Sequence, residues 1–143
     1  MLTPGFKFLP HTTDAYIEAV GATFDQALEN AALALFDTMC NLGSITQSEQ
    51  DVIRLTDKDD EAILYDWLES LLLKFELEHR VYSKFHVSVA GEPQGLRLTA
   101  KAYGEEFDRK KHGAKVEVKA VTYHRLEVSR QQGVVTVRFI LDL

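Results

Sequence analysis

Two aspartates near the two ends of the sequence have the residue type and pattern of a cation site. Asp14 opens an alternating apolar segment at 15–20, and Asp142 lies in a second alternating segment at 134–143. Each aspartate falls on the face opposite the apolar residues of its predicted strand. If the two strands are neighbours, both carboxylates and the terminal carboxylate of Leu143 converge. Such oxygen donors suit a hard cation, Ca²⁺ or Mg²⁺.

A simpler interpretation of these residues stays open. Asp14 also suits a turn, because its short carboxylate competes for backbone hydrogen bonds, and Asp142 also suits a solvated end. His11, three residues before Asp14, can orient that carboxylate or touch a partner, but it also fits a turn residue bonded to the backbone. Most surface carboxylates bind nothing, so the residues alone favour the simpler interpretation.

A polar stretch near the C-terminal end is a second candidate surface. The segment 115–128 alternates and is predicted to form one long strand. This alternation places Lys119, Tyr123 and Arg125 on one face, with His124 on the other. The face is either a docking surface for a partner protein or an ordinary exposed face of a sheet.

Motifs of known chemistry are absent from the sequence. It contains no GxGxxG or GxxxxGK[ST] loop, no HExxH and no GxSxG. Its five histidines show no zinc spacing. These absences favour a binding protein over an enzyme. The rival is a metal-dependent hydrolase that uses the two aspartates with His11 or His124 as base, because catalytic groups often meet only in the folded protein.

Length and composition narrow the class further. The 143 residues fit one domain, 1–143, with a core that needs no disulfide or structural metal. A net charge of −6 argues against strong direct nucleic-acid binding and against an anionic membrane surface. An acidic protein can still dock on a basic one. A single cysteine, Cys40, and the lack of a signal peptide or apolar span predict a cytoplasmic protein.

Hydrophobic periodicity predicts an α+β domain with two amphipathic helices and a mostly antiparallel sheet or sandwich of about eight strands. Thr23 with Gln26 marks the start of the first helix, and Asp57 or Asp59 caps the second. The stretch 105–113 is predicted to be a solvated, charged loop.

Several segments of the chain resemble the archease family, in order and over nearly the whole sequence. HTTD at 11–14 resembles the family's HTAD signature, and GATFDQALENAALALFDTM at 21–39 and LYDWLESLL at 64–72 resemble its two helices. YGEEFDRKKHGAKVEVKAVTYHRLEV at 103–128 resembles its G-E-x-F…H…E-V-K-A-x-T-Y segment, and the chain closes in LDL. The individual matches are short, and their order makes the set specific.

The resemblance implies a protein cofactor, not an enzyme. Archeases assist the RtcB-type RNA ligase of tRNA splicing by promoting its guanylylation and repeated turnover. An alternative description makes them chaperones of tRNA or DNA methyltransferases. The family binds a metal, Ca²⁺, through positions that correspond here to Asp14, Asp142 and Leu143. One departure is that Ala15 and Tyr16 follow the signature, where the family often has a small residue and Gly. Tyr16 is predicted to crowd or to shield the site.

Overall fold

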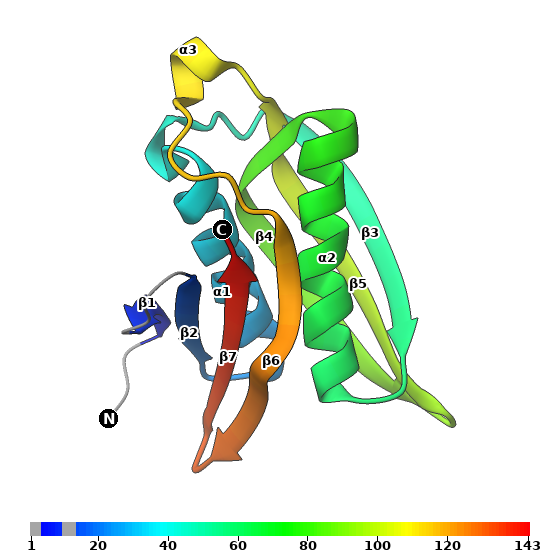
Figure 1. Cartoon of the computed structure of the whole chain (residues 1–143). Helices are drawn as coiled ribbons and strands as arrows, with labels where there is room; N and C mark the ends of the chain where they lie inside the picture. Colours follow the sequence, from blue (N-terminus) through cyan, green and yellow to red (C-terminus); the bar gives the residue numbers. More distant parts are fainter. Residues whose placement is uncertain (1–3, 10–13) are drawn as a thin grey trace.

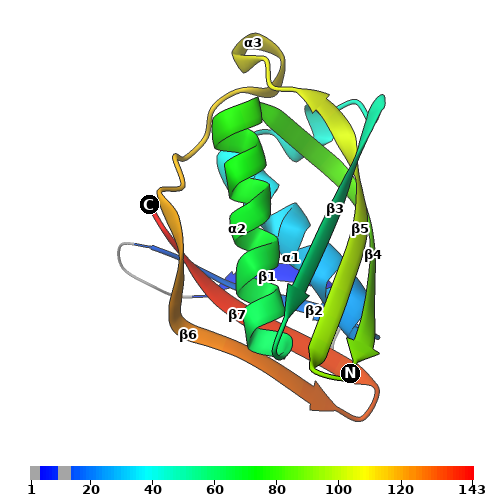
Figure 2. The same cartoon turned by 90° about the vertical axis from the view of Figure 1, so that its right-hand side faces the viewer.

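The computed structural model describes residues 4–9 and 14–143, and within them two antiparallel sheets enclose two long helices (Figures 1 and 2). The four-stranded sheet has the order β1-β2-β7-β6. Its strands are β1 (Gly5–Leu9), β2 (Ala15–Gly21), β7 (Val134–Asp142) and β6 (Ala120–Gln131). The three-stranded sheet has the order β3-β5-β4. Its strands are β3 (Glu49–Asp57), β5 (Gly95–Glu106) and β4 (Arg80–Glu92). The predicted α+β class is confirmed.

Both long helices begin where the sequence predicts. Helix α1 (Phe24–Met39) starts after Thr23, whose hydroxyl accepts the backbone N–H of Gln26 at 3.1 Å. Helix α2 (Asp60–Glu78) is capped by Asp59, whose carboxylate accepts the N–H of Ala62 at 2.9 Å. The cap of α2 is therefore Asp59 and not Asp57, which belongs to β3.

Helix α1 lies between the two sheets and binds both with polar side chains. Asn30 donates to the carbonyl of Val20 in β2 at 2.8 Å. Asp25 accepts the N–H of Val89 and Glu29 that of Val87, so two backbone donors of the edge strand β4 are satisfied. Gly21 ends β2 against the first turn of α1, where a Cβ would lie 2.5 Å from the nitrogen of Ala27. No side chain fits at that approach.

The stretch 105–113, predicted as a solvated loop, instead contains a short helix, α3 (Arg109–His112), and a buried histidine. His112 Nδ1 accepts the N–H of Asp108 at 2.9 Å, so the ring proton is assigned to Nε2, which donates to Glu105 at 2.7 Å. Hydrogen bonds from Lys111, from the backbone of Thr46 and from His112 lower the pKa of Glu105 to about 2. These bonds hold together the segment 105–113, which we call the α3 lobe.

The predicted strand at 115–128 is also wrong in part. Only its second half is a strand, because β6 begins at Ala120. The preceding residues form an extended strap along the end of α1, with Lys115 and Val116 donating to the carbonyls of Met39 and Thr38. Within the described residues the strands number seven, against the prediction of about eight.

No helix among residues 4–9 and 14–143 combines the length and apolar character needed to cross a membrane. Cys40 is fully buried after the last turn of α1, and burial raises the pKa of its thiol to about 11. A thiol in that state is a small core residue and a poor nucleophile.

We predict that His112→Ala lowers the free energy of unfolding by about 2–4 kcal/mol, because it removes a buried ring and two hydrogen bonds. Urea denaturation measures the loss. Lys110→Ala, on the exposed side of the same short helix, is the control and is expected to change stability by no more than about 0.5 kcal/mol. Equal stability of the two variants would show that the histidine does not hold the lobe.

A pair of carboxyl groups near the start of α2 makes stability depend on pH. Burial of Asp57 and its proximity to Asp66 raise the pKa of Asp57 from 3.8 to about 6. Between these values the folded protein keeps a proton that the unfolded chain has released. The stability that this proton contributes is therefore lost as the pH rises from about 4 through about 6.

We predict that Asp66→Asn flattens this decline, because the substitution removes the like charge beside Asp57. Unfolding free energies measured between pH 4 and pH 7 provide the test, and the variant should gain on the parent chain as the pH rises. Glu61→Gln, an exposed acid in the first turn of the same helix, should leave the decline in place. Parallel profiles for Asp66→Asn and the parent would disprove the coupling.

Candidate metal and partner-contact site

The two candidate aspartates lie at the same end of the four-stranded sheet. In the antiparallel pairing of β2 with β7, Ala15 lies opposite Leu141. One further step in this register places Asp14 beside Asp142. Directly opposed residues have Cα atoms about 4.5–5.5 Å apart and side chains on the same face. Asp14 is the residue before β2 and the pairing itself ends at Ala15, so a neighbouring position of the two partly exposed aspartates is what the continued register predicts.

The shared face is the outer one, turned away from the helices. The alternate positions Ile17 and Phe139, which oppose each other in the pairing, are fully buried in the core. The backbone of Asp142 is held by its pairing with Ala120 and by the N–H of Lys119, which donates to its carbonyl at 2.7 Å. The Leu143 side chain is half-buried against the core, so its main-chain oxygens are anchored next to this carboxylate.

A charged cluster occupies the middle of the same face. Glu18, with a side chain only 5% exposed, lies 3.2 Å from Lys7 Nζ on β1 and 3.4 Å from Arg138 on β7. These three residues are in register across three strands, because Glu18 pairs with Lys7 on one side and with Arg138 on the other. The alternation had placed Glu18 and Arg138 on the faces of the two aspartates. Their opposite charges at matching positions were a signal that could have paired the strands.

The predicted arrangement of Tyr123, His124 and Arg125 is wrong. Four residues of β6, 123–126, stand opposite the single residue Phe139, since the pairing moves from Thr122–Ile140 to Glu127–Arg138. Arg125 has a positive φ of 57° within this bulge. Alternation is lost there, so the faces of these residues cannot be read from their spacing.

The bulge sends its side chains to two sides of the sheet. Tyr123 stacks on Tyr65 of α2 with ring centroids 4.0 Å apart, although it remains 63% exposed. The Arg125 guanidinium lies over the ring of Tyr16, 5.8 Å from its centroid, on the outer face. Tyr123 and Arg125 therefore do not share a face. His124 and Lys119 are exposed, and His11 lies outside the described residues.

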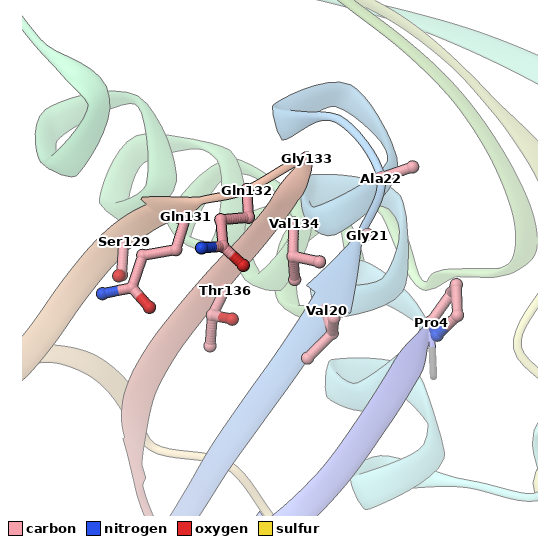
Figure 3. A pocket seen from close by; sticks show the side chains of 10 residues that line it. All are labelled: Pro4, Val20, Gly21, Ala22, Ser129, Gln131, Gln132, Gly133, Val134 and Thr136. Atoms are coloured by element: carbon pink, nitrogen blue, oxygen red, sulfur yellow. The ribbon is translucent and has the colours of Figure 1, made fainter. Parts of the chain in front are cut away.

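A neutral hollow continues this outer face at the end far from the aspartates (Figure 3). Its volume is about 550 Å³, and it lies where the β6–β7 hairpin meets the end of β2. Val20, Thr136 and Ser129 line its floor, and the amide side chain of Gln131 lies at its rim. The hollow brings no ionisable group to the face, so its lining offers no acid–base chemistry.

The aspartate pair offers donor atoms of the kind that a hard cation needs. Two facing carboxylates and the main-chain oxygens of Leu143 are all-oxygen donors, which match Ca²⁺ or Mg²⁺. Like charges at directly opposed positions repel, and a bound cation would relieve that repulsion. No group of three or more His, Cys, Asp or Glu side chains gathers at a metal-binding distance anywhere in the described ranges. These residues fit part of a coordination shell, and water or a partner must supply the rest.

Comparison with known proteins identifies the family. Residues 6–143 match the model of the Archease protein family (MTH1598/TM1083). The chain belongs to the archease family. It is 39% identical over 139 residues to the archease of Methanothermobacter thermautotrophicus, covering 97% of this chain and 99% of that one. It is 36% identical over 138 residues to the archease of Sulfurisphaera tokodaii, with 96% and 98% covered.

Two solved structures share the archease fold. The solution structure of Methanobacterium thermoautotrophicum protein 1598 superposes with a TM-score of 0.86 at 37% identity, covering 97% of this chain and 99% of that one. A crystal structure from Thermotoga maritima, described as an archease and possible chaperone, gives a TM-score of 0.61 at 20% identity over 100% and 98%. This second likeness establishes the fold alone.

The family's G-E-x-F…H segment has a structural explanation in this archease. A Cβ at Gly104 would collide with the carbonyl oxygen of Val81 where β5 passes β4. Glu105 and His112 are bonded to each other, and the His112 ring stacks on Phe107 at 5.7 Å. The Gly, Glu and His of this segment therefore serve to build the α3 lobe. The aspartate end of the four-stranded sheet remains the candidate site.

We predict that Glu18→Gln destabilises this archease by about 1–3 kcal/mol, because it leaves two cations beside an uncharged buried amide. Thermal and urea unfolding measure the loss. The matched control is Glu127→Gln, an exposed acid 3.9 Å from the same Arg138, which should cost less than about 0.5 kcal/mol. Equal losses would place the stabilising contact elsewhere.

Proposed function

We propose that this archease is a protein cofactor of an RtcB-type RNA ligase in tRNA splicing. It promotes guanylylation of the ligase and allows repeated turnover, without catalysing a reaction of its own. The observation that carries the proposal is the family match over residues 6–143, combined with facing carboxylates at an exposed sheet end.

In this proposal Asp14, Asp142 and a main-chain oxygen of Leu143 hold Ca²⁺ or another divalent cation. When bound, the cation neutralises charge and orients oxygen ligands for phosphoryl chemistry. The chain itself fixes the positions of these oxygen donors. The backbone bond from Lys119 holds Asp142 in place, and the Glu18–Arg138 pair keeps β2 and β7 in the register that brings the two aspartates together.

Partner contact is proposed around this same end of the sheet. Exposed Lys119, Tyr123 and His124 border it, with the Tyr123 ring held on Tyr65. These exposed side chains can bind a protein surface, Tyr123 from the helix side of the sheet, while the aspartates on the outer face lie toward its phosphate site. The acidic net charge suits a ligase whose RNA channel is basic, since opposite charge speeds encounter and orients docking.

The deciding experiment is RNA ligation by the cognate RtcB-type ligase at limiting concentration, with and without this archease. The proposal requires more than one product per ligase molecule only when the archease is present, and more guanylylated ligase in the first turnover. No change in either quantity would disprove it.

We predict that Asp14→Asn and Asp142→Asn each abolish this stimulation while leaving the unfolding midpoint nearly unchanged, because both side chains are partly exposed. Calorimetric titration with Ca²⁺ should show weaker binding for both variants. Glu106→Gln removes one exposed carboxylate from the far lobe and is the charge-matched control. Full stimulation by both aspartate variants would exclude the site.

A second candidate function, chaperoning a tRNA or DNA methyltransferase, has one observation in its favour. Leu73 and Leu77, one turn apart on α2, are 41% and 74% exposed. Two leucines form a small patch. Suppression of methyltransferase aggregation that is lost in Leu77→Ser but kept in Asp14→Asn would favour this function. A hydrolase would instead turn over a phosphoester with added metal and no partner.

A further inference from the structure

The outer face of the three-stranded sheet has an unusual charge composition for an acidic protein. Its alternate positions on the other side, such as Ile53, Leu98 and Val87, are buried in the core. Between the bulge of β4 and the β4–β5 hairpin, the fourteen outward positions of the paired strands, nearly all exposed, include four cations, one histidine and a single carboxylate, Glu92 at the hairpin end. They are Gln50, Val52, Arg54, Thr56, Lys84, His86, Ser88, Ala90, Glu92, Gly95, Arg97, Thr99, Lys101 and Tyr103.

This face concentrates positive charge against the trend of the whole chain. The net charge is −6, so setting aside the four cations of this face leaves −10 for the remainder. Cations placed together on one face of a sheet repel one another and lower stability. Arg54 and Lys101 take part in no ion pair within the part of the chain that the structure describes. A binding partner with negative charge would offset this repulsion.

The cations follow a regular path over the sheet. Arg54 lies opposite Thr99, which is between Arg97 and Lys101 on β5, and Lys84 lies opposite Tyr103, two positions further on. Each step combines one strand spacing with two residues of rise, which is about 8 Å. The path covers roughly 20 Å from Arg97 to Tyr103, because six residues of a strand rise about 3.4 Å each. It resembles a line of charges rather than a single anion pocket.

One part of the path forms a hollow in addition to carrying charge. A hollow of about 300 Å³ lies between Arg54 and Arg97, with Thr56 and Thr99 offering hydroxyls. Glu92, the next residue outward at the hairpin tip, pairs with Arg97 Nε at 2.6 Å. That exposed pair contributes little and leaves the other guanidinium nitrogens to donate. At the opposite end, Lys84 Nζ lies 5.4 Å from the Tyr103 ring.

From this placement we propose that the outer face of the β3-β5-β4 sheet binds the phosphate backbone of a single RNA strand. The choice of RNA among polyanions rests on the proposed function, whose ligase acts on RNA. Arginines and lysines at regular steps neutralise successive phosphates, and hydroxyls of Thr and Ser donate to phosphate oxygens. Four contacts give weak binding that depends strongly on salt, so the expectation of no strong direct nucleic-acid binding still holds.

An acidic protein surface is the competing occupant, and the composition of the face disfavours it. Stable protein interfaces have an apolar core with charge at the rim. Here the central strand β5 holds Arg97, Thr99 and Lys101, and the large exposed apolar residue, Val52, is on the edge strand β3. An exposed sheet face with cations and one tyrosine ring is the arrangement that suits an extended strand of nucleotides.

The test is fluorescence anisotropy of a short single-stranded RNA titrated with the full chain at several salt concentrations. Four phosphate contacts predict that the affinity falls about 50-fold between 50 and 200 mM salt, since each contact contributes a slope of about 0.7 for a single strand. Arg54→Gln with Lys101→Gln removes two contacts and should reduce this change to about 7-fold. Arg109→Gln with Lys110→Gln removes the same charge from α3 and should keep the parent slope.

Three results would overturn the proposal. The first is an absence of RNA binding at low salt, and the second is an identical slope for both double variants. The third is a loss of affinity of Arg54→Gln, Lys101→Gln for RNA-free ligase, which would assign the face to a protein. Stimulation of the ligase without RNA binding would leave the proposed function standing and remove this inference alone. RNA binding without stimulation of the ligase would leave this inference standing and disprove the proposed function.

Discussion

The fold depends on helix α1 being bound from two sides by two different sheets. Nearly every apolar residue of α1 is buried, and its polar residues are used as well. Asn30 donates to a carbonyl of β2, while Asp25 and Glu29 accept backbone N–H groups of the edge strand β4. An exposed edge strand invites unwanted pairing. These two acids remove that hazard and fix where the three-stranded sheet lies, so each sheet turns its inner face to the helices.

The outer face of the four-stranded sheet then depends on one register. Glu18 and Arg138 are opposed across β2 and β7, and the same register continues to Asp14 and Asp142. A slip of either strand by one residue would send its charged side chains, Asp14 and Glu18 or Arg138 and Asp142, to the core side, where charges are costly. The buried ion pair is therefore useful for specifying alignment, even though its net contribution to stability is modest. The candidate cation site is a consequence of that alignment.

The parts of the fold that the sequence predicted are those with local causes. Thr23 and Asp59 start helices because their side chains accept N–H groups three residues away, and alternation in β7 places Val137 and Phe139 in the core. What escaped prediction depends on partners far along the chain. The bulge at 123–126 exists because Tyr123 reaches α2 and Arg125 reaches β2. Of the candidate site, alternation predicted the face on which each aspartate lies, whereas the pairing of their two strands needed the folded structure, and their cation remains a prediction.

The net charge of the chain describes its average charge correctly but does not show how the charged residues are distributed over the surface. The aspartates and the cations lie on the outer faces of different sheets, with the helix layer between them (Figure 2). Packed layers lie about 10 Å apart, so the two faces are separated by roughly 20 Å. This separation exceeds the Debye length of about 8 Å at physiological salt. The negative excess therefore does not cancel the field at Arg54 and Lys101. An acidic protein can consequently be drawn to a basic partner through one part of its surface and hold a polyanion on another, because each contact responds to the charges within its own screening distance.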